Sequence, residues 1–325
     1  MNGDFFEALD RAGFGSNVHE VAAEGECRVL RLDDKTGEGF MTMYRVFDGI
    51  YLMYNDFHLQ SCRSEYQNAE TVFCIDHCRE GRIEHENDLG GRYYMEAGDI
   101  RIDRRVHHEG SIHMPLSHYH GITVGFVQRL AERSLAEAFP LLNIDLSQLS
   151  DKFCPQGKEI LLRSNELLNQ IFAQLYHVPH GIRTDYYRIK TVELLLLLNT
   201  LDPTQINEQR QYFPASQTEK IKQIHSLITE KLDMTYSVEA LSEEFDLPPA
   251  TLRKVFKGVY GKPVYQYIKS CKMKAAASML ITDRALNISE IAQKVGYDNA
   301  SKFSAAFRDV MGVTPQNYRN RQEEP

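Results

Sequence analysis

Two segments near the C-terminus repeat one pattern, and this repeat constrains the fold more than any other feature of the sequence. In each segment, apolar residues recur at helical spacing before and after a short turn. Gly296 suits a left-handed helix end, Asn299 suits the cap of the helix that follows, and Pro249 suits a first helical turn. The pattern therefore predicts two helix-turn-helix units, at residues 238–260 and 288–311.

A helix is expected between the two units, over Pro263 to Thr282. Its apolar residues follow helical spacing: Val264, Ile268, Cys271, Ala275 and Met279. A helix of about twenty residues is roughly 30 Å long, close to the roughly 34 Å turn of B-DNA. One chain could therefore place its two units in successive major grooves.

Charge in this region is one-sided. From Leu247 to Thr282 there is no Asp or Glu, but there are seven Lys and Arg residues. Such a run suits a polyanion such as DNA. The alternative is a lysine-rich helix face that only contacts solvent.

The residues of this region resemble the AraC/XylS family of transcriptional regulators. The resemblance covers the last third of the chain and rests on Gly261–Tyr267, Lys272–Met273, Ala276, Met279–Leu280, Ile288, Glu290–Ala292, Gly296–Tyr297, Phe303, Phe307–Arg308, Gly312–Pro315 and Tyr318–Arg319. It implies a seven-helix DNA-binding domain whose third and sixth helices enter the major groove. The sequence departs from the family at Ala305, where an Arg is usual, and at Ser242 and Pro248. The change at Ala305 would weaken base recognition by that helix or shift it onto Asn299, Ser301, Lys302 and Ser304.

The exposed faces of the two groove helices supply the predicted DNA contacts. The base-reading residues are expected to be Ala250, Thr251, Arg253, Lys254, Ala300, Ser301, Lys302 and Ser304. The residues expected nearer the phosphates are Lys257, Arg308 and Arg319. Phe307 and Tyr318 are expected in the core.

Length and charge favour two domains of different character. The chain has 325 residues, and its net charge of -8 divides into 21 Lys and Arg against 32 Asp and Glu up to residue 213, and 16 against 13 afterwards. The N-terminus has no signal-peptide pattern, and Leu194–Leu198 is too short for a membrane span. Six irregularly spaced cysteines suit reduced thiols, so the chain is expected in the cytoplasm.

The N-terminal half is rich in predicted strands. They are expected at Cys27–Leu32, Phe40–Phe47, Ile50–Tyr54, Thr71–Ile75, Gly81–Glu86, Arg92–Met95, Asp99–Ile102 and Gly121–Phe126, after a short helix at Phe5–Ala12. Their spacing predicts an antiparallel barrel or sandwich, a fold that can hold one small ligand. The piece from Met95 to Ile102, followed by His107 and His108, resembles the cupin-like sensor domains of the same family. This resemblance implies that the barrel is a sensor.

Histidines gather towards the end of this half. The effector pocket is expected to include Tyr93, His107, His118 and His120. His118 and His120 have the spacing of a metal pair on one strand face, but no glutamate follows at the expected distance, so no metal and no cofactor are expected. In a second cluster, Cys74 and Cys78 share a strand face and His77 points away, which argues against a shared metal. No catalytic residues and no enzymatic activity are expected.

Helices are expected after Val127, at Arg129–Phe139, Lys158–His177 and Ile182–Leu201. The last two carry apolar stripes broader than one barrel wall can cover, which favours a helix-pair dimer interface over packing within one chain. Asp202 to Ser216 reads as a linker.

The expected class is therefore α+β. We expect a cupin-like antiparallel barrel at residues 1–128, a helical dimerisation segment at 129–201, a linker at 202–216 and an all-α DNA-binding domain at 217–325. The expected function is a sequence-specific transcriptional activator that binds promoter DNA as a homodimer, responds to a small effector and contacts RNA polymerase. Two alternatives stay open: a barrel that serves only as a dimerisation or partner scaffold, and a metal-dependent cupin enzyme with a DNA-binding tail.

Overall fold

The computed structural model describes residues 15–87, 90–163, 165–203 and 211–320, without the side chains of 65–70 and 106–109. The expected helix at Phe5–Ala12 lies outside the described residues. The chain divides into two compact units. One comprises residues 1–86 and 93–211, and the other residues 87–92 and 212–325.

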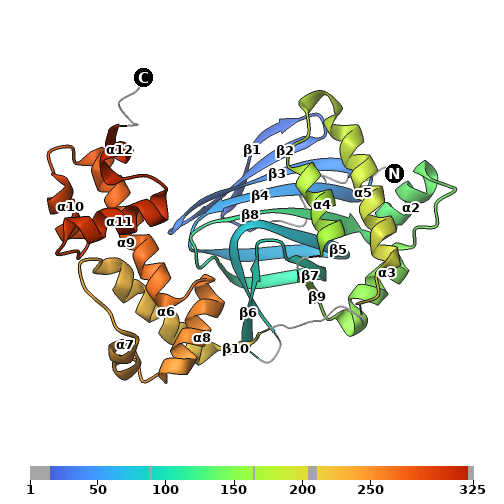
Figure 1. Ribbon diagram of the computed structural model, residues 1–325. Coiled ribbons are helices and arrows are strands. Elements are labelled where there is room, and N and C mark those ends of the chain that lie inside the picture. The colour runs from blue at the N-terminus through green and yellow to red at the C-terminus, as the bar shows by residue number, and fades with distance from the viewer. Residues whose placement is uncertain (1–14, 88–89, 164, 204–210, 321–325) are drawn as a thin grey trace. The chain divides into compact units, whose positions relative to one another are not determined.

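The N-terminal unit is built on one curved sheet (Figure 1). Its strands are β1 (Val18–Glu24), β2 (Cys27–Asp34), β3 (Gly37–Phe47), β4 (Ile50–His58), β5 (Ser61–Glu86), β6 (Gly91–Glu96), β7 (Ile100–His113), β8 (Tyr119–Val127) and β9 (Ile160–Leu162). The order is β1-β2-β3-β4-β8-β5-β6, with β7 beside β5 and β9 beside β7. Strands β1 to β4 and β8 pair antiparallel. The expected α+β class is confirmed, and the expected antiparallel barrel or sandwich is present as a half-barrel.

Two strands of this unit differ from the expectation. β1 carries mostly exposed residues, so it has no apolar alternation that sequence reading could find. The predicted helix at Lys158–His177 is wrong at its start, because Ile160–Leu162 form β9 against β7. The helix α4 (Glu166–Leu175) begins only after Asn165, whose side chain accepts a hydrogen bond from the Leu168 amide at 3.1 Å.

The sheet has apolar side chains on both faces. Along β4, Ile50 and Leu52 belong to one core, and Tyr51 and Met53 belong to the other. The first core lies against the helices α2 (Gln128–Ala138), α3 (Leu146–Phe153), α4 and α5 (Arg183–Thr200), with short 3-10 turns at Pro155–Gly157 and His180–Ile182. The second core, rich in Met, Tyr and Cys, lines the concave side of the sheet. We call this concave side the barrel interior.

Helix α5 is apolar on more than one side. Leu194, Leu195 and Leu198 are fully buried in the core beneath it. Ile189 and Leu196 on the same helix are 62% and 38% exposed. The apolar stripe is thus wider than the surface that its own chain covers. Among the described residues, no helix has both the length and the apolar character needed to cross a membrane.

The C-terminal unit is helical. Its described part contains seven helices: α6 (Ala215–Glu230), α7 (Val238–Glu244), α8 (Pro249–Tyr260), α9 (Val264–Thr282), α10 (Ile288–Lys294), α11 (Ala300–Met311) and α12 (Pro315–Asn320). A short strand β10 (Phe213–Pro214) precedes them and pairs with Gly91 and Arg92, the first two residues of β6, which belong to this unit rather than to the N-terminal one. The third and sixth helices of the unit are α8 and α11. Two helix-turn-helix units joined by the long helix α9 are present, as expected.

Candidate nucleic-acid interface

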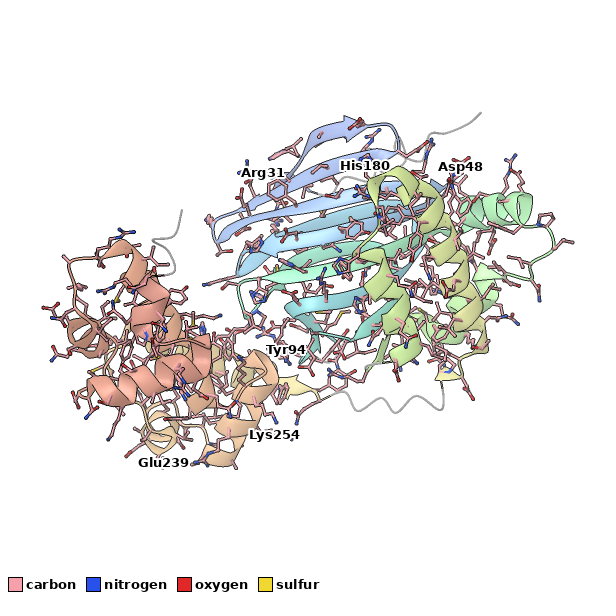
Figure 2. All side chains as sticks on the ribbon, turned by 45° about the horizontal axis from the view of Figure 1, so that its top comes forward. Arg31, Asp48, Tyr94, His180, Glu239 and Lys254 are labelled. Atoms are coloured by element: carbon pink, nitrogen blue, oxygen red, sulfur yellow. The ribbon has the colours of Figure 1, made fainter. Side chains whose placement is uncertain are left out.

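Helix α8 presents a polar face to solvent. Pro249 occupies its first turn and Gly261 ends it in the left-handed conformation, with a φ of 75°. Leu252, Val255 and Phe256 are buried, which fixes the rotation of the helix. The opposite side exposes Ala250, Arg253, Lys254 and Lys257, with Thr251 half-buried. Figure 2 shows Lys254 on this exposed side.

Arg253 has a partner on the preceding helix. Its Nη2 atom lies 2.9 Å from the Oε1 atom of Glu239 on α7. The two side chains are 56% and 69% exposed, and a pair in such contact with water contributes only about 0–1 kcal/mol. Arg253 can therefore exchange Glu239 for a base or a phosphate at little cost.

Helix α11 begins with a side-chain cap. The Oδ1 atom of Asn299 accepts hydrogen bonds from the amides of Ser301 and Lys302 at 2.9 and 3.0 Å. The predicted cap is confirmed, and the side-chain oxygen of Asn299 is occupied by these two hydrogen bonds. Base recognition by Asn299 and its neighbours stays a prediction. Ser301, Lys302 and Ala305 are exposed, and Ala300 and Ser304 are half-buried.

The three predicted phosphate residues lie in different settings. Lys257 and Arg308 are exposed, each in the last turn of its groove helix. Arg319 is half-buried, and its Nη2 atom donates to the carbonyl oxygen of Leu286 at 2.8 Å. That hydrogen bond ties α12 to the loop before α10, so Arg319 acts within the domain, and its phosphate contact remains a prediction.

Three of the seven basic residues between Leu247 and Thr282 have partners inside the C-terminal unit. Besides Arg253, Lys269 on α9 lies 2.6 Å from Asp309 on α11. Lys272 is 6% exposed, and its Nζ atom donates to the carbonyl oxygen of Met234 at 3.0 Å. Burial lowers the pKa of Lys272. The run is thus not one continuous basic surface, and four exposed members remain: Lys254, Lys257, Lys262 and Lys274.

Helix α9 takes part in the packing of both helix-turn-helix units. Near its start, Tyr267 contacts Phe256 and Tyr260 of α8, with ring centroids 5.5 and 5.0 Å apart. Its later residues Met273 and Leu280 lie in the core formed with α10 and α11. Nineteen residues give α9 a length of about 28 Å. The two units therefore share one rigid helix.

A second contact joins the two helix-turn-helix units at the turn between α10 and α11. Gly296 has a φ of 74°, and a Cβ atom placed there would lie 2.1 Å from the carbonyl oxygen of Asp233, in the loop before α7. The Nζ atom of Lys272 lies 5.8 Å from the centre of the Tyr297 ring beside this glycine. We call the contact of Gly296 and Tyr297 with Asp233 and Lys272 the inter-unit contact. It fixes the angle between the units as well as their separation.

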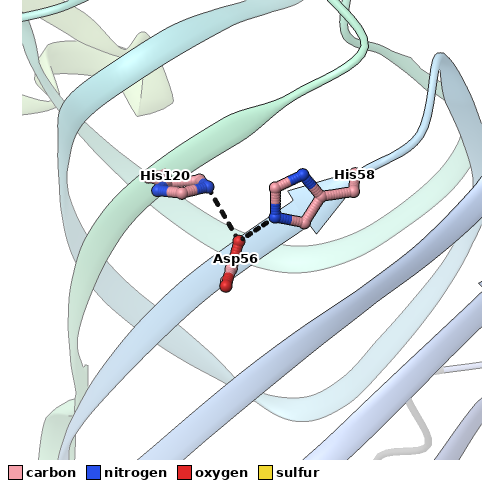
Figure 3. Close-up of side chains that lie close together, drawn as sticks. All are labelled: Asp56, His58 and His120. Carbon is pink, nitrogen blue, oxygen red and sulfur yellow. Dashed lines mark ion pairs between the residues drawn. The ribbon is translucent and has the colours of Figure 1, made fainter. Parts of the chain in front are cut away.

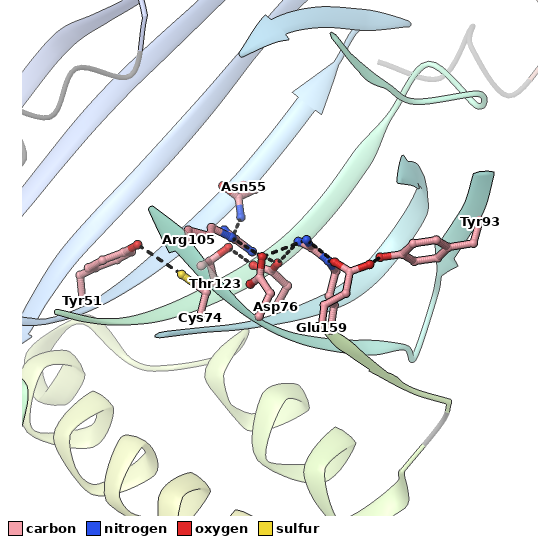
Figure 4. Close-up of polar contacts among 10 residues, drawn as sticks. Tyr51, Asn55, Cys74, Asp76, Tyr93, Arg105, Thr123 and Glu159 are labelled. Carbon is pink, nitrogen blue, oxygen red and sulfur yellow. Dashed lines mark hydrogen bonds and ion pairs between the residues drawn. The ribbon is translucent and has the colours of Figure 1, made fainter. Parts of the chain in front are cut away.

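The barrel interior holds a buried charged network (Figure 4). Arg101 lies 2.9 Å from Asp103 and 2.6 Å from Glu159, and Arg105 lies 3.0 Å from Asp103 and also pairs with Asp76. Two guanidinium groups thus face three carboxylates. The Oδ1 atom of Asp103 is buried and, within the described part of the chain, accepts no hydrogen bond.

The residues predicted for an effector pocket do not lie together. Tyr93 is fully buried in the barrel interior and donates to Glu159. His120 shares its β8 face with Ile122 and Val124, which belong to the helix-covered core, so it lies on the opposite face from Tyr93. His118 precedes β8, with its Nδ1 atom 2.9 Å from the Leu116 carbonyl oxygen, and the side chain of His107 lies outside the described residues.

The cluster at Cys74, His77 and Cys78 divides between the two faces, as expected. Both cysteines belong to the core of the barrel interior. The His77 ring stacks on Phe172 of α4 with centroids 4.5 Å apart. Burial lowers the pKa of His77 to about 4, so this imidazole is neutral at physiological pH.

Comparison with known proteins identifies the helical unit. Residues 241–321 match a family described as a helix-turn-helix domain. The Msm operon regulatory protein of Streptococcus mutans is 24% identical over 69% of this chain and 76% of its own length. The HTH-type transcriptional activator RhaR of Mannheimia succiniciproducens is 24% identical over 47% of this chain and 54% of its own length.

A third relative, the HTH-type transcriptional regulator AdiY of Escherichia coli, is 28% identical over 31% of this chain and 39% of its own length. Both latter matches thus span less than two thirds of the relative. The matched segments include the paired helix-turn-helix units whose caps and cores are described above. These matches and the residue pattern from Gly261 to Arg319 agree, and residues 241–321 form a helix-turn-helix domain of the AraC type, similar to those of transcriptional regulators.

Proposed function

We propose that this regulator reads two successive major grooves of promoter DNA with α8 and α11, and that a small effector bound by the N-terminal unit controls this reading. The observation that carries the proposal is the rigid connection between the two units, made by the shared helix α9 and the inter-unit contact. A fixed separation near one helical turn of DNA favours one face of the duplex.

Within this proposal, the exposed residues of each groove helix have separate tasks. Arg253 and Lys254 on α8, and Ser301 and Lys302 on α11, contact base edges, with Ala250, Thr251, Ala300 and Ser304 beside them. A good bidentate contact of Arg253 with guanine contributes about 1–3 kcal/mol of discrimination. Lys257 and Arg308 lie near phosphates, where they add affinity without sequence preference.

Selection of bound genomic fragments followed by footprinting tests the proposal. We expect two protected patches about one helical turn apart on one face of the DNA. Arg253→Ala should relax preference at one base pair. Lys257→Ala should weaken binding to all sequences alike and reduce the salt slope by about one unit. Equal losses from both variants on selected and random DNA would contradict the division of tasks.

The barrel interior is the proposed effector site. Its charged network and the unpaired Oδ1 atom of Asp103 support a small polar ligand with a hydrogen-bond donor. This site takes the place of the predicted histidine pocket, whose residues do not lie together. The genes beside the bound genomic fragments indicate which metabolites are relevant. Substrates and products of the enzymes encoded by those genes are then tested for binding by calorimetry. An effector that binds the wild-type chain and not Asp103→Asn supports the site.

We further propose a homodimer formed through α5, and activation through contact with RNA polymerase. The exposed apolar residues Ile189 and Leu196 support the dimer, because their burial against a second copy would remove apolar surface from water. Transcription in vitro from a selected promoter, with and without the regulator, tests activation. A fall in transcript on addition of the protein would show repression instead.

A further inference from the structure

Three side chains suited to a metal ion meet on the sheet surface at the ends of β4 and β8 (Figure 3). Asp56 and His58 are two residues apart on β4, so they share a face. His120 on β8 lies directly opposite Asp56 in the strand ladder. The Oδ1 atom of Asp56 is 2.8 Å from the Nε2 atom of His58 and 2.8 Å from that of His120. The three donor atoms lie within 4.8 Å of one another.

Hydrogen bonding does not account for the position of His120. Its Nε2 atom is buried, although a third of the side chain is exposed. Within the described residues this atom has no hydrogen-bond partner, because the short contact with Asp56 lacks hydrogen-bond geometry. A buried nitrogen held 2.8 Å from a carboxylate oxygen without a hydrogen bond is arranged as a ligand atom would be.

The donor set selects the kind of ion. Two imidazole nitrogens and one carboxylate oxygen suit Zn²⁺ and similar transition metals, whereas Ca²⁺ and Mg²⁺ prefer oxygen ligands. In a tetrahedral zinc site the ligand atoms are about 3.3 Å apart, so each of the two contacts between Asp56 and a histidine needs to lengthen by only about 0.5 Å. The ladder fixes the strands themselves, which makes the site largely preformed.

Neighbouring strands hold further ligands within reach. Glu38 on β3 lies opposite His58, and Glu80 on β5 lies opposite His120. Directly opposite residues have Cβ atoms about 5 Å apart. A carboxylate from either strand, or a water molecule, would complete four-fold coordination.

We propose that Asp56, His58 and His120 bind one Zn²⁺ ion per chain and that the ion clamps β4 to β8. The site lies on the opposite face of the sheet from the barrel interior, and it does not depend on the proposed function. It would give the N-terminal unit an inorganic ligand in addition to any organic effector.

Titration of the metal-stripped full-length protein with Zn²⁺ by calorimetry tests the proposal. We expect one ion per wild-type chain. His58→Gln, His120→Gln and Asp56→Asn should each weaken binding by roughly tenfold or more, since even changes outside the first ligand shell cost about 10- to 100-fold. His180→Gln, an exposed histidine elsewhere on the same unit, should leave the affinity unchanged.

Two further measurements separate this site from other sources of binding. Co²⁺ in the site should show visible absorption without the thiolate charge-transfer bands that the cysteines would produce. Circular dichroism without metal should match the wild type in every variant, because the three residues are at the surface. Absence of Zn²⁺ binding, a thiolate spectrum, or equal affinities for the wild type and the three folded variants would overturn the proposal.

Discussion

Replacement of Gly296 by alanine tests the rigid connection between the two helix-turn-helix units. The residue has a φ of 74°, which costs a residue with a Cβ about 1–2 kcal/mol. The new methyl group would also lie 2.1 Å from the Asp233 carbonyl oxygen and 2.9 Å from the Lys272 Nζ atom. Since the oxygen belongs to the backbone, relief requires a shift of the loop, and such overpacking costs about 1–3 kcal/mol more.

Gly312 provides the matched control. It ends α11 with a φ of 78°, close to that of Gly296, but a Cβ atom there meets nothing within 4 Å. Gly312→Ala should therefore reduce the free energy of unfolding by about 1–2 kcal/mol, and Gly296→Ala by about 2–5 kcal/mol. The difference between the variants measures the inter-unit contact.

Urea denaturation of the two variants gives these free energies. DNA binding gives a second measurement on the same proteins. Gly296→Ala should lose more affinity for a complete two-part site than for a single half-site, because the angle between α8 and α11 changes. Equal destabilisation by the two substitutions, with equal loss of affinity for the complete site and the half-site, would refute the claim that the inter-unit contact fixes the angle between α8 and α11.

Three further predictions concern the N-terminal unit. Ile189→Glu places a charge on the exposed stripe of α5 and should convert a dimer to a monomer in sedimentation; an unchanged dimer would exclude this face. Asp76→Ala leaves Arg101 and Arg105 with fewer partners in a buried setting. It should reduce the free energy of unfolding, measured in urea, by about 3–5 kcal/mol. A loss below about 1 kcal/mol would mean that the network is solvated. His77 has a folded-state pKa of about 4, below its ordinary value, so the unfolded chain binds the proton more readily and stability falls as pH drops from about 6.5 to about 4. His77→Phe should remove this one-proton dependence, and an unchanged pH profile of unfolding would contradict the burial of a neutral imidazole.

Local signals made the helical unit predictable. Pro249, Asn299 and Gly296 act within a few residues of their own position, and each takes the predicted place at a helix end or turn. The apolar stripes around them then decide which sides of α8 and α11 are buried. Caps and periodicity are properties of short segments, so one sequence suffices to read them.

Partners distant in sequence could not be predicted in the same way. Nothing near Lys272 indicates that its ammonium group is buried against Met234, and the basic run reads the same whether Arg253 is free or paired with Glu239. The apolar triplet of β9 fits a helix as well as a strand until β7 lies beside it. Such contacts depend on the tertiary fold.

The histidines show the same limit most clearly. The spacing of His118 and His120 drew attention to that pair, but strand pairing brings His120 to Asp56 and His58 instead. The metal ligands come from segments more than 60 residues apart, and only the ladder between β4 and β8 aligns them.

The spacing of half-sites in DNA tests the central claim most directly. With the half-sites identified by footprinting, binding is measured to duplexes in which their centres lie about 10 or about 15 base pairs apart. If α9 and the inter-unit contact hold α8 and α11 rigidly on one face of the duplex, the longer spacing rotates one half-site by about half a turn away from that face. Affinity for the longer spacing should then be no higher than affinity for a single half-site. Equal affinity for the two spacings would contradict a rigid pair of reading helices.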